Sequence, residues 1–159
     1  MAPKSPDSAI SAVWRLARRQ HGVVSRAQLL RFGLSQEWIR HRIARGRLHP
    51  IRRGVYAVGR PEVSQLGHWI AAVLSCGDQA ALSHESAAAL WRIRSAPQGT
   101  IDVSVPAPRD PRPPGVRVHQ RSNLLSEDVV ERHNIPLTSP ALTLIDLATR
   151  LHLASWKGR

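Results

Sequence analysis

The sequence contains a single cysteine and no long apolar run, and each shortage excludes a class of protein. Cys76 has no second cysteine to pair with, which excludes a disulfide framework and a thiolate metal cluster and favours a reducing, cytoplasmic location. No segment approaches 18 uninterrupted apolar residues, so the sequence predicts no membrane span. The opening residues MAPKSPDS lack an apolar core after Lys4 and do not form a secretory signal.

Acidic residues are also scarce, and this leaves a strong and uneven positive charge. The 159 residues include 23 Lys and Arg but 11 Asp and Glu, which gives a formal net charge of +12. Residues 1–60 carry 13 basic and two acidic side chains, whereas residues 61–159 carry 10 and nine. Because concentrated positive charge is typical of a surface that binds a polyanion, we expect the N-terminal part to bind nucleic acid.

The charged part coincides with a helix-turn-helix pattern. Ser25, followed three residues later by Gln28, matches a capping box that begins one helix, and Gly33 can end that helix in the left-handed conformation. A three-residue turn then leads to Ser35, which can cap a second helix. Three apolar side chains form the expected inward face of this second helix: Trp38, Ile39 and Ile43.

A basic hairpin follows the second helix. Residues 48–51 and 55–58 can pair across Arg52-Arg53-Gly54, which gives a wing with two arginines at its tip. The sequence therefore predicts a winged helix-turn-helix whose second helix reads base edges and whose wing meets phosphate. The expected DNA-binding residues are Arg26, Gln36, Arg40, His41, Arg45, Arg47, Arg52 and Arg53.

The fold class expected for the whole chain is α+β, a winged helix-turn-helix followed by a small mixed α/β body. Residues 1–7 contain Pro and Ser and are expected to be disordered. Residues 8–60 form the expected DNA-binding domain and residues 61–159 the body, with the break at Gly59-Arg60-Pro61.

Within the body, two patterns lead to specific expectations. The strand IDVSV alternates, so we expect it to be half-buried with Asp102 facing outward. The last helix begins at Pro140 after the cap Ser139, and its expected buried stripe is Ala141, Leu144, Ile145, Ala148 and Leu151. Because Leu142 and Leu147 lie off that stripe, we expect an uncovered apolar patch and self-association.

Candidate catalytic groups are few. Ser83-His84-Glu85 are neighbours on a predicted helix and point in different directions, so we interpret Ser83 as a helix cap and not as a nucleophile. Asp102 lies on a strand, where a nuclease can place a metal-binding acid, but no Glu-x-Lys partner follows it. The histidines show no metal-ligand spacing. We therefore expect no catalytic residue, no metal and no cofactor.

Several segments, in order, resemble the AbiEi-type antitoxin family: the run from RRQHGVVSRAQLL to IRRGVYAVG, then AAVLSCG, LSHESAAALW, IDVSVP and IPLTSPALTLIDLA. They span residues 14–151. The resemblance implies that the winged helix binds DNA, typically the operator of its own operon, and regulates transcription. It also implies that the body belongs to the antitoxin of a type IV toxin-antitoxin system, whose partner is a nucleotidyltransferase-like toxin.

Many proteins of this kind continue into an endonuclease-like domain related to very-short-patch-repair nucleases. The final residues HLASWKGR do not look like the family, so we expect a body truncated at its C-terminal end and do not transfer nuclease activity. Two alternatives stay open at this point. The chain is a remnant of such an endonuclease whose N-terminal part only positions DNA, or it is an RNA-binding module.

Overall fold

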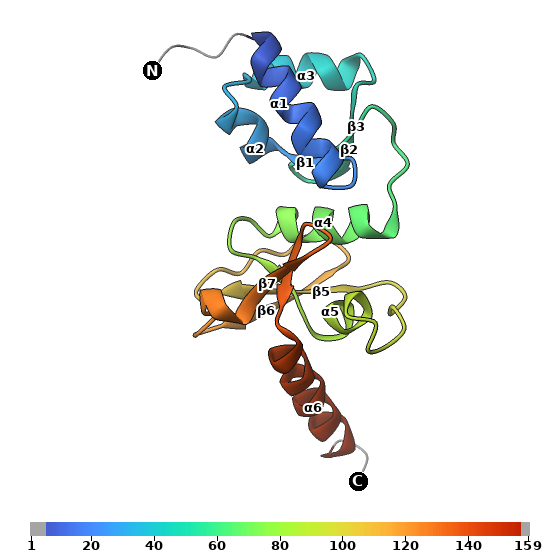
Figure 1. The fold of residues 1–159 in the computed structure, drawn as a ribbon, viewed down its shortest axis with the longest axis vertical. Coiled ribbons are helices and arrows are strands. Elements are labelled where there is room, and N and C mark those ends of the chain that lie inside the picture. The colour runs from blue at the N-terminus through green and yellow to red at the C-terminus, as the bar shows by residue number, and fades with distance from the viewer. Residues whose placement is uncertain (1–5, 157–159) are drawn as a thin grey trace. The chain divides into compact units, whose positions relative to one another are not determined.

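The computed structural model describes residues 6–156 and divides into two compact units, Met1–Ser75 (unit 1) and Cys76–Arg159 (unit 2) (Figure 1). In unit 1 the elements are α1 (Pro6–Arg19), β1 (Val23–Ser25), α2 (Arg26–Arg31), α3 (Gln36–Ala44), β2 (Leu48–Arg52), β3 (Val55–Val58) and α4 (Gln65–Ser75). In unit 2 they are β4 (Ala81–Leu82), α5 (His84–Leu90), β5 (Ile101–Pro106), β6 (Val116–Arg121), η1 (Ser126–Asp128), β7 (Val129–Arg132), β8 (Ile135–Thr138) and α6 (Pro140–Trp156). None of the helices in the described part is long and apolar enough to cross a membrane.

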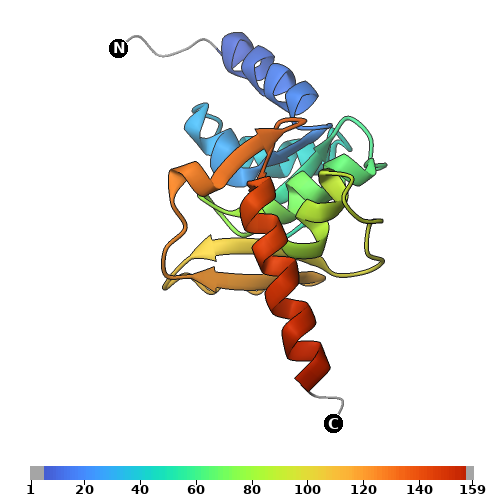
Figure 2. The same ribbon diagram turned by 60° about the horizontal axis from the view of Figure 1, so that its bottom comes forward.

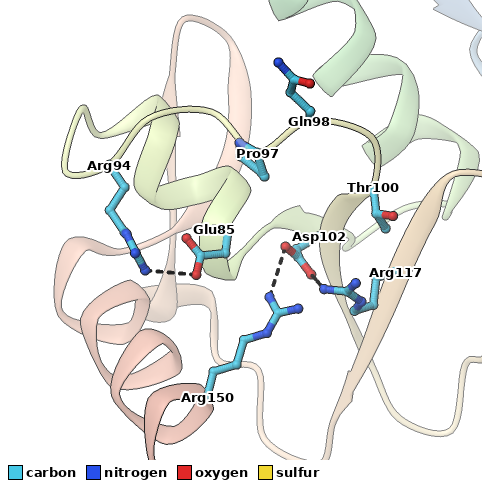
Figure 3. A pocket seen from close by; sticks show the side chains of 8 residues that line it. All are labelled: Glu85, Arg94, Pro97, Gln98, Thr100, Asp102, Arg117 and Arg150. Atoms are coloured by element: carbon cyan, nitrogen blue, oxygen red, sulfur yellow. Dashed lines mark hydrogen bonds and ion pairs between the residues drawn. The ribbon is translucent and has the colours of Figure 1, made fainter. Parts of the chain in front are cut away.

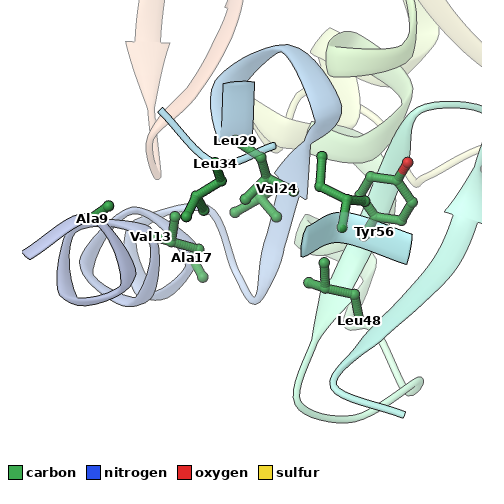
Figure 4. Packing of buried hydrophobic residues seen from close by; sticks show 9 residues of the cluster. Ala9, Val13, Ala17, Val24, Leu29, Leu34, Leu48 and Tyr56 are labelled. Atoms are coloured by element: carbon green, nitrogen blue, oxygen red, sulfur yellow. The ribbon is translucent and has the colours of Figure 1, made fainter. Parts of the chain in front are cut away.

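Unit 1 is built from helices packed on a small antiparallel sheet of order β1-β3-β2. Apolar side chains from α1, α2, α3 and the sheet meet in one core (Figure 4). Its buried members are Ala9, Val13, Ala17, Val24, Leu29, Leu34, Ile39, Leu48 and Tyr56. This core fixes the helix-turn-helix against the hairpin, as a winged helix requires, and the predicted fold class is confirmed.

The local signals at the helix ends act as expected. Gln28 N–H donates to Ser25 Oγ while Ser25 N–H donates to Gln28 Oε1, which completes the capping box. Gly33 has φ 84° and ends α2, and Ser35 Oγ accepts a hydrogen bond from Trp38 N–H at the start of α3. The turn between the helices is therefore determined by the same residues that predicted it.

Helix α1 begins at Pro6, so Pro6 and Asp7, which were expected to be disordered, belong to the helix, whereas residues 1–5 lie outside the described part. Trp14 is exposed, because the buried stripe runs through Ala9, Val13 and Ala17 and leaves the indole on the flank of the helix. There its ring edge lies over Gly59, where an added Cβ would be 3.6 Å from the indole Cη2.

Helix α4 belongs with unit 1. It packs on β1, β2 and β3, and its buried residues include Trp69, Ile70 and Val73. Gly67 comes so close to the chain at His21 that an added Cβ would be 3.1 Å from the His21 carbonyl oxygen. The boundary between the two units therefore follows Ser75 and lies beyond the break expected at Gly59-Arg60-Pro61.

Unit 2 contains a mixed five-stranded sheet of order β6-β5-β4-β8-β7. β5 pairs parallel with β6 and antiparallel with β4, and β8 pairs parallel with β4 and antiparallel with β7. The β7–β8 hairpin turns at His133 and Asn134, both at positive φ, where the sequence predicted a turn. Helix α5 packs on β5, on β8 and on α6.

The strand β5 is buried on both faces, and the expected outward position of Asp102 is therefore wrong. Ile101, Val103 and Val105 lie on one face as predicted, but Asp102 and Ser104 are buried on the other. The physical reason is that helix α5 packs on the strand and side chains of α6 reach it. A period-2 pattern identifies the apolar face of a strand but cannot show that a polar face is covered.

The orientation of α6 is the largest departure from the sequence prediction. Leu144 and Ile145, expected in the buried stripe, are 52% and 59% exposed, and Ala141 and Ala148 are exposed as well. The buried face carries Thr143, Asp146 and Leu147, and nothing is described for the side chain of Leu151. The helix is held by polar contacts, and Figures 1 and 2 both show its C-terminal end running beyond the strands of the unit.

Candidate nucleic-acid interface

The second helix of the helix-turn-helix, α3, presents a polar face to solvent. Its buried and half-buried side chains Trp38, Ile39 and Ile43 pack on the unit 1 core, as predicted. The remaining positions therefore point away from the core. The expected contact residues on this helix are all exposed: Gln36, Arg40, His41 and, just past its end, Arg45.

One cation of α3 is held in place by an aromatic ring. The guanidinium of Arg42 lies 4.8 Å from the ring centroid of Trp38, one helical turn away, in a cation–π contact. This contact orders a long side chain at the edge of the exposed face. Arg42 is therefore a further positioned cation beside the expected contact residues.

The wing is attached to the start of α2 through the backbone. Arg26 N–H donates to the Gly54 carbonyl oxygen at 2.8 Å, and Gly54, with φ 71°, makes the turn of the hairpin. Arg26 and Arg53, both exposed, are thereby brought to the same edge of unit 1. Arg52 is half-buried and takes part in an interaction of its own, so it contributes less free charge than the sequence suggested.

The hairpin base joins the end of α3. Gly59 N–H donates to the Arg47 carbonyl oxygen at 3.0 Å, and Arg47 itself is exposed at the corner between α3 and β2. The structure thus arranges the expected residues in two groups. One group lies along α3 and its end, and the other lies at the wing turn and the start of α2. Their roles in DNA binding remain a prediction.

Unit 2 contains a buried polar cluster that sequence reasoning did not predict: His84, Asp102, His119, Arg121 and Asp146. His119 Nε2 lies 2.9 Å from Asp102 Oδ1, and Arg121 forms an ion pair with Asp146. The rings of His84 and His119 stack with centroids 3.7 Å apart. The parallel pairing of β5 with β6, which sets Ser104 opposite His119, makes these contacts possible. This pairing joins residues far apart in the sequence, so no short sequence pattern predicts it.

Ser83 occupies the N-cap position of α5, as predicted, but its side chain makes no capping hydrogen bond. Its Oγ lies 3.0 Å from His84 Nδ1, and its N–H donates to the Asp102 carbonyl oxygen. Burial, together with the neighbouring His119, lowers the pKa of His84 to about 4, and the Asp146 carboxylate opposes this shift. His84 is therefore neutral at pH 7, and the Ser83 hydroxyl is a hydrogen-bond partner of its ring.

The described residues contain no group of three or more His, Cys, Asp and Glu arranged to hold a metal ion. The rings of His84 and His119 stack on each other, and both histidines contact buried carboxylates, His84 with Asp146 and His119 with Asp102. The geometry of the polar cluster fits the attachment of α6 better than bond cleavage.

Family models match both parts of the chain. The model described as transcriptional regulator, AbiEi antitoxin, matches residues 12–59, and that of the AbiEi antitoxin C-terminal domain matches residues 79–157. The chain belongs to the AbiEi antitoxin family. The resemblance inferred from the sequence is confirmed. Membership of this family, together with the winged-helix N-terminal domain, supports a DNA-binding, regulatory role.

Comparison with curated protein sequences gives no significant match. Among solved structures the chain is similar to the RV2827C protein from Mycobacterium tuberculosis, with 22% identity and a TM-score of 0.49. The match covers 94% of this chain and 63% of that chain. The chain thus spans less than two thirds of the length of that protein.

Proposed function

We propose that the chain is the antitoxin of an AbiEi-type (type IV) toxin-antitoxin system and that unit 1 binds duplex DNA, the operator of its own operon. The single observation that carries the DNA-binding part is the coincidence of charge and fold. Unit 1 carries 13 basic and three acidic side chains, and the exposed face of α3 and the wing turn are rich in arginine. Concentrated charge on the reading elements of a winged helix is the electrostatic footprint of a duplex reader.

In this proposal the two groups of residues have different tasks. Gln36, Arg40, His41 and Arg45 on α3 enter the major groove, where a guanidinium can bind guanine O6 and N7 together. The second group contacts the phosphates of the backbone and positions the reading helix: Arg26, Arg47, Arg52 and Arg53. A regulator of this kind acts in the cytoplasm, with the DNA.

The proposed protein partner is a nucleotidyltransferase-like toxin. In this proposal unit 2 is the antitoxin body and makes the contact with the toxin. Support for it comes from the match of residues 79–157 to the AbiEi antitoxin C-terminal domain. Co-expression with the product of an adjacent or overlapping nucleotidyltransferase gene tests it. Relief of growth arrest by the chain is the expected result, and growth arrest unchanged by the chain would contradict the antitoxin role.

The DNA-binding part is tested by the salt dependence of duplex affinity. Each neutralised phosphate contributes about −0.9 to the slope of log K against log salt, so engagement of three or more arginines gives a slope of about −3 or steeper. The duplex is taken from the region upstream of the gene, and duplex RNA of the same sequence serves as the competitor. Affinity that does not change with salt, or stronger binding to the RNA, would contradict the proposal.

A further inference from the structure

We propose that unit 2 contains a binding site for a phosphate group, in a hollow between β5, β6, α5 and α6 that Arg117 and Arg150 line from opposite sides (Figure 3). The hollow has a volume of about 460 Å³. The residues around it are Glu85, Arg94, Pro97, Gln98, Thr100, Asp102, Arg117 and Arg150. The site is separate from the winged helix and does not depend on the DNA-binding proposal.

The first argument is that the two arginines converge. Arg117 Nη1 lies 3.4 Å from Asp102 Oδ1, and Arg150 Nη1 lies 3.6 Å from Asp102 Oδ2. Both distances are long for charge-assisted bonds. Asp102 is 2% exposed and lies at the floor, whereas the side chains of Arg117 and Arg150 are 47% and 38% exposed. The carboxylate therefore orients two guanidinium groups at the mouth without using most of their N–H donors.

The second argument is an unmet donor. Nη1 of Arg150 is buried, and at 3.6 Å from Asp102 Oδ2 it is close enough for an ion pair but has no hydrogen-bond partner among the described residues. A buried, charged donor without an acceptor is costly, and such groups mark places where a ligand or ion completes the bonding. The Asp102 carboxylate is shared by three groups: Oδ1 lies 2.9 Å from His119 Nε2 and 3.4 Å from Arg117 Nη1, and Oδ2 lies 3.6 Å from Arg150 Nη1.

The third argument is the balance of charge and the chemistry of the rim. Three guanidinium groups and two carboxylates line the hollow, and Glu85 is already paired with Arg94 at 3.1 Å. Arg117 and Arg150 thus face one buried carboxylate, which leaves a positive excess at the mouth. Planar guanidinium forks match the spacing of phosphate oxygens, and Thr100 and Gln98 add neutral hydrogen-bonding groups nearby.

The site is tested on the full chain by ¹⁵N–¹H NMR, with inorganic phosphate replacing chloride at constant ionic strength and pH 7.5. We expect saturable shifts at the amides of Thr100, Asp102 and Arg117. Shifts that stay linear in phosphate, or that appear only in unit 1, would overturn the proposal. Methyl phosphate and dimethyl phosphate then identify the source: preference for the monoester indicates a small phosphorylated ligand, and equal binding indicates a nucleic-acid phosphodiester.

Variants make the test specific. Arg117→Gln should weaken phosphate binding about tenfold or more, since a charge-assisted fork is lost. Arg112→Gln, which removes an equally charged arginine paired with Asp110 outside the hollow, should leave binding unchanged. Equal weakening by both variants would show non-specific attraction and overturn the site.

Asp102→Asn separates a ligand site from a structural ion pair. If the arginines hold phosphate, removing the competing carboxylate should strengthen binding about threefold or more, while the amide keeps an acceptor for His119. Unchanged or weaker phosphate binding by a variant whose spectrum remains dispersed would contradict the proposal. If this variant does not fold, the comparison of Arg117→Gln with Arg112→Gln still decides it.

Discussion

Unit 1 and unit 2 distribute their polar residues in opposite ways. Unit 1 has a net charge of +10, a core of apolar side chains, and arginines on its surface. Unit 2 has 10 basic and eight acidic side chains, and it buries Asp102 and Asp146 within ion pairs. The comparison teaches that charge in unit 1 stays on the surface, where we propose that it binds DNA, whereas buried charge in unit 2 ties helix α6 to the sheet.

The largest effect is expected where the polar cluster is broken. Asp146→Ala leaves Arg121 and His84 without their carboxylate, and removal of one partner of a buried ion pair costs about 3–5 kcal/mol. Urea unfolding followed by circular dichroism measures this. Asp110→Ala breaks the exposed pair with Arg112 and should cost less than about 1 kcal/mol. Both pairs lie in unit 2, so similar losses for the two variants would contradict the claim that buried charge, and not charge as such, stabilises this unit.

A smaller effect is expected in DNA recognition. Arg40→Ala and Arg45→Ala should each cost about 1–3 kcal/mol on the preferred duplex and reduce its advantage over a scrambled one, because base contacts are lost. Arg53→Ala in the wing should weaken binding to both duplexes almost equally, because phosphates carry no sequence. Fluorescence anisotropy on the two duplexes measures the difference. If the wing variant changes the preferred sequence and the α3 variants do not, the roles are reversed.

The pH dependence of stability sharpens the comparison further. The folded-state pKa of His84, about 4, lies below its ordinary value of 6.5, so the unfolded chain binds the extra proton between these values. Stability should therefore fall as the pH drops from about 7 to 5, by roughly 1–2 kcal/mol from this residue. His84→Gln should remove that part of the loss, as urea unfolding at several pH values would show. An identical pH profile for the variant would contradict it.

The smallest effect on stability is expected on the exposed face of α6. Leu144→Ser and Ile145→Ser remove side chains that do not contribute to the core, so unfolding should change by no more than about 0.5 kcal/mol. Light scattering over a dilution series tests self-association through this face. We expect the wild type to associate and the double variant to be monomeric. A wild type that stays monomeric at high concentration would contradict the association.

Local patterns predicted unit 1 well because its determinants are local. The Ser25–Gln28 capping box, the left-handed Gly33 and the Ser35 cap each depend on a few neighbouring residues. The apolar period of α3 likewise predicted which side chains reach the core. Eight expected contact residues could be placed on this frame from the sequence, and seven of them are exposed, with Arg52 half-buried.

The same methods failed in unit 2 because polar residues there are buried by distant partners. Asp102 is covered only once β6 pairs in parallel with β5 and α6 returns to bring Arg150. In α6 the buried face carries Thr143 and Asp146, so apolar periodicity identified the wrong side of the helix. Thr143 Oγ1 donates to the Thr138 carbonyl oxygen, a contact that no hydropathy pattern reveals.

The central claim is that duplex binding resides in unit 1, and two variants with equal loss of charge test it most directly. Arg26→Ala/Arg53→Ala removes two cations at the wing turn, and Arg109→Ala/Arg112→Ala removes two exposed cations from unit 2. The slope of log K against log salt for duplex binding is measured for both. The first variant should make the negative slope shallower by nearly 2, and the second should leave the slope unchanged. Equal changes in the two slopes would contradict the claim.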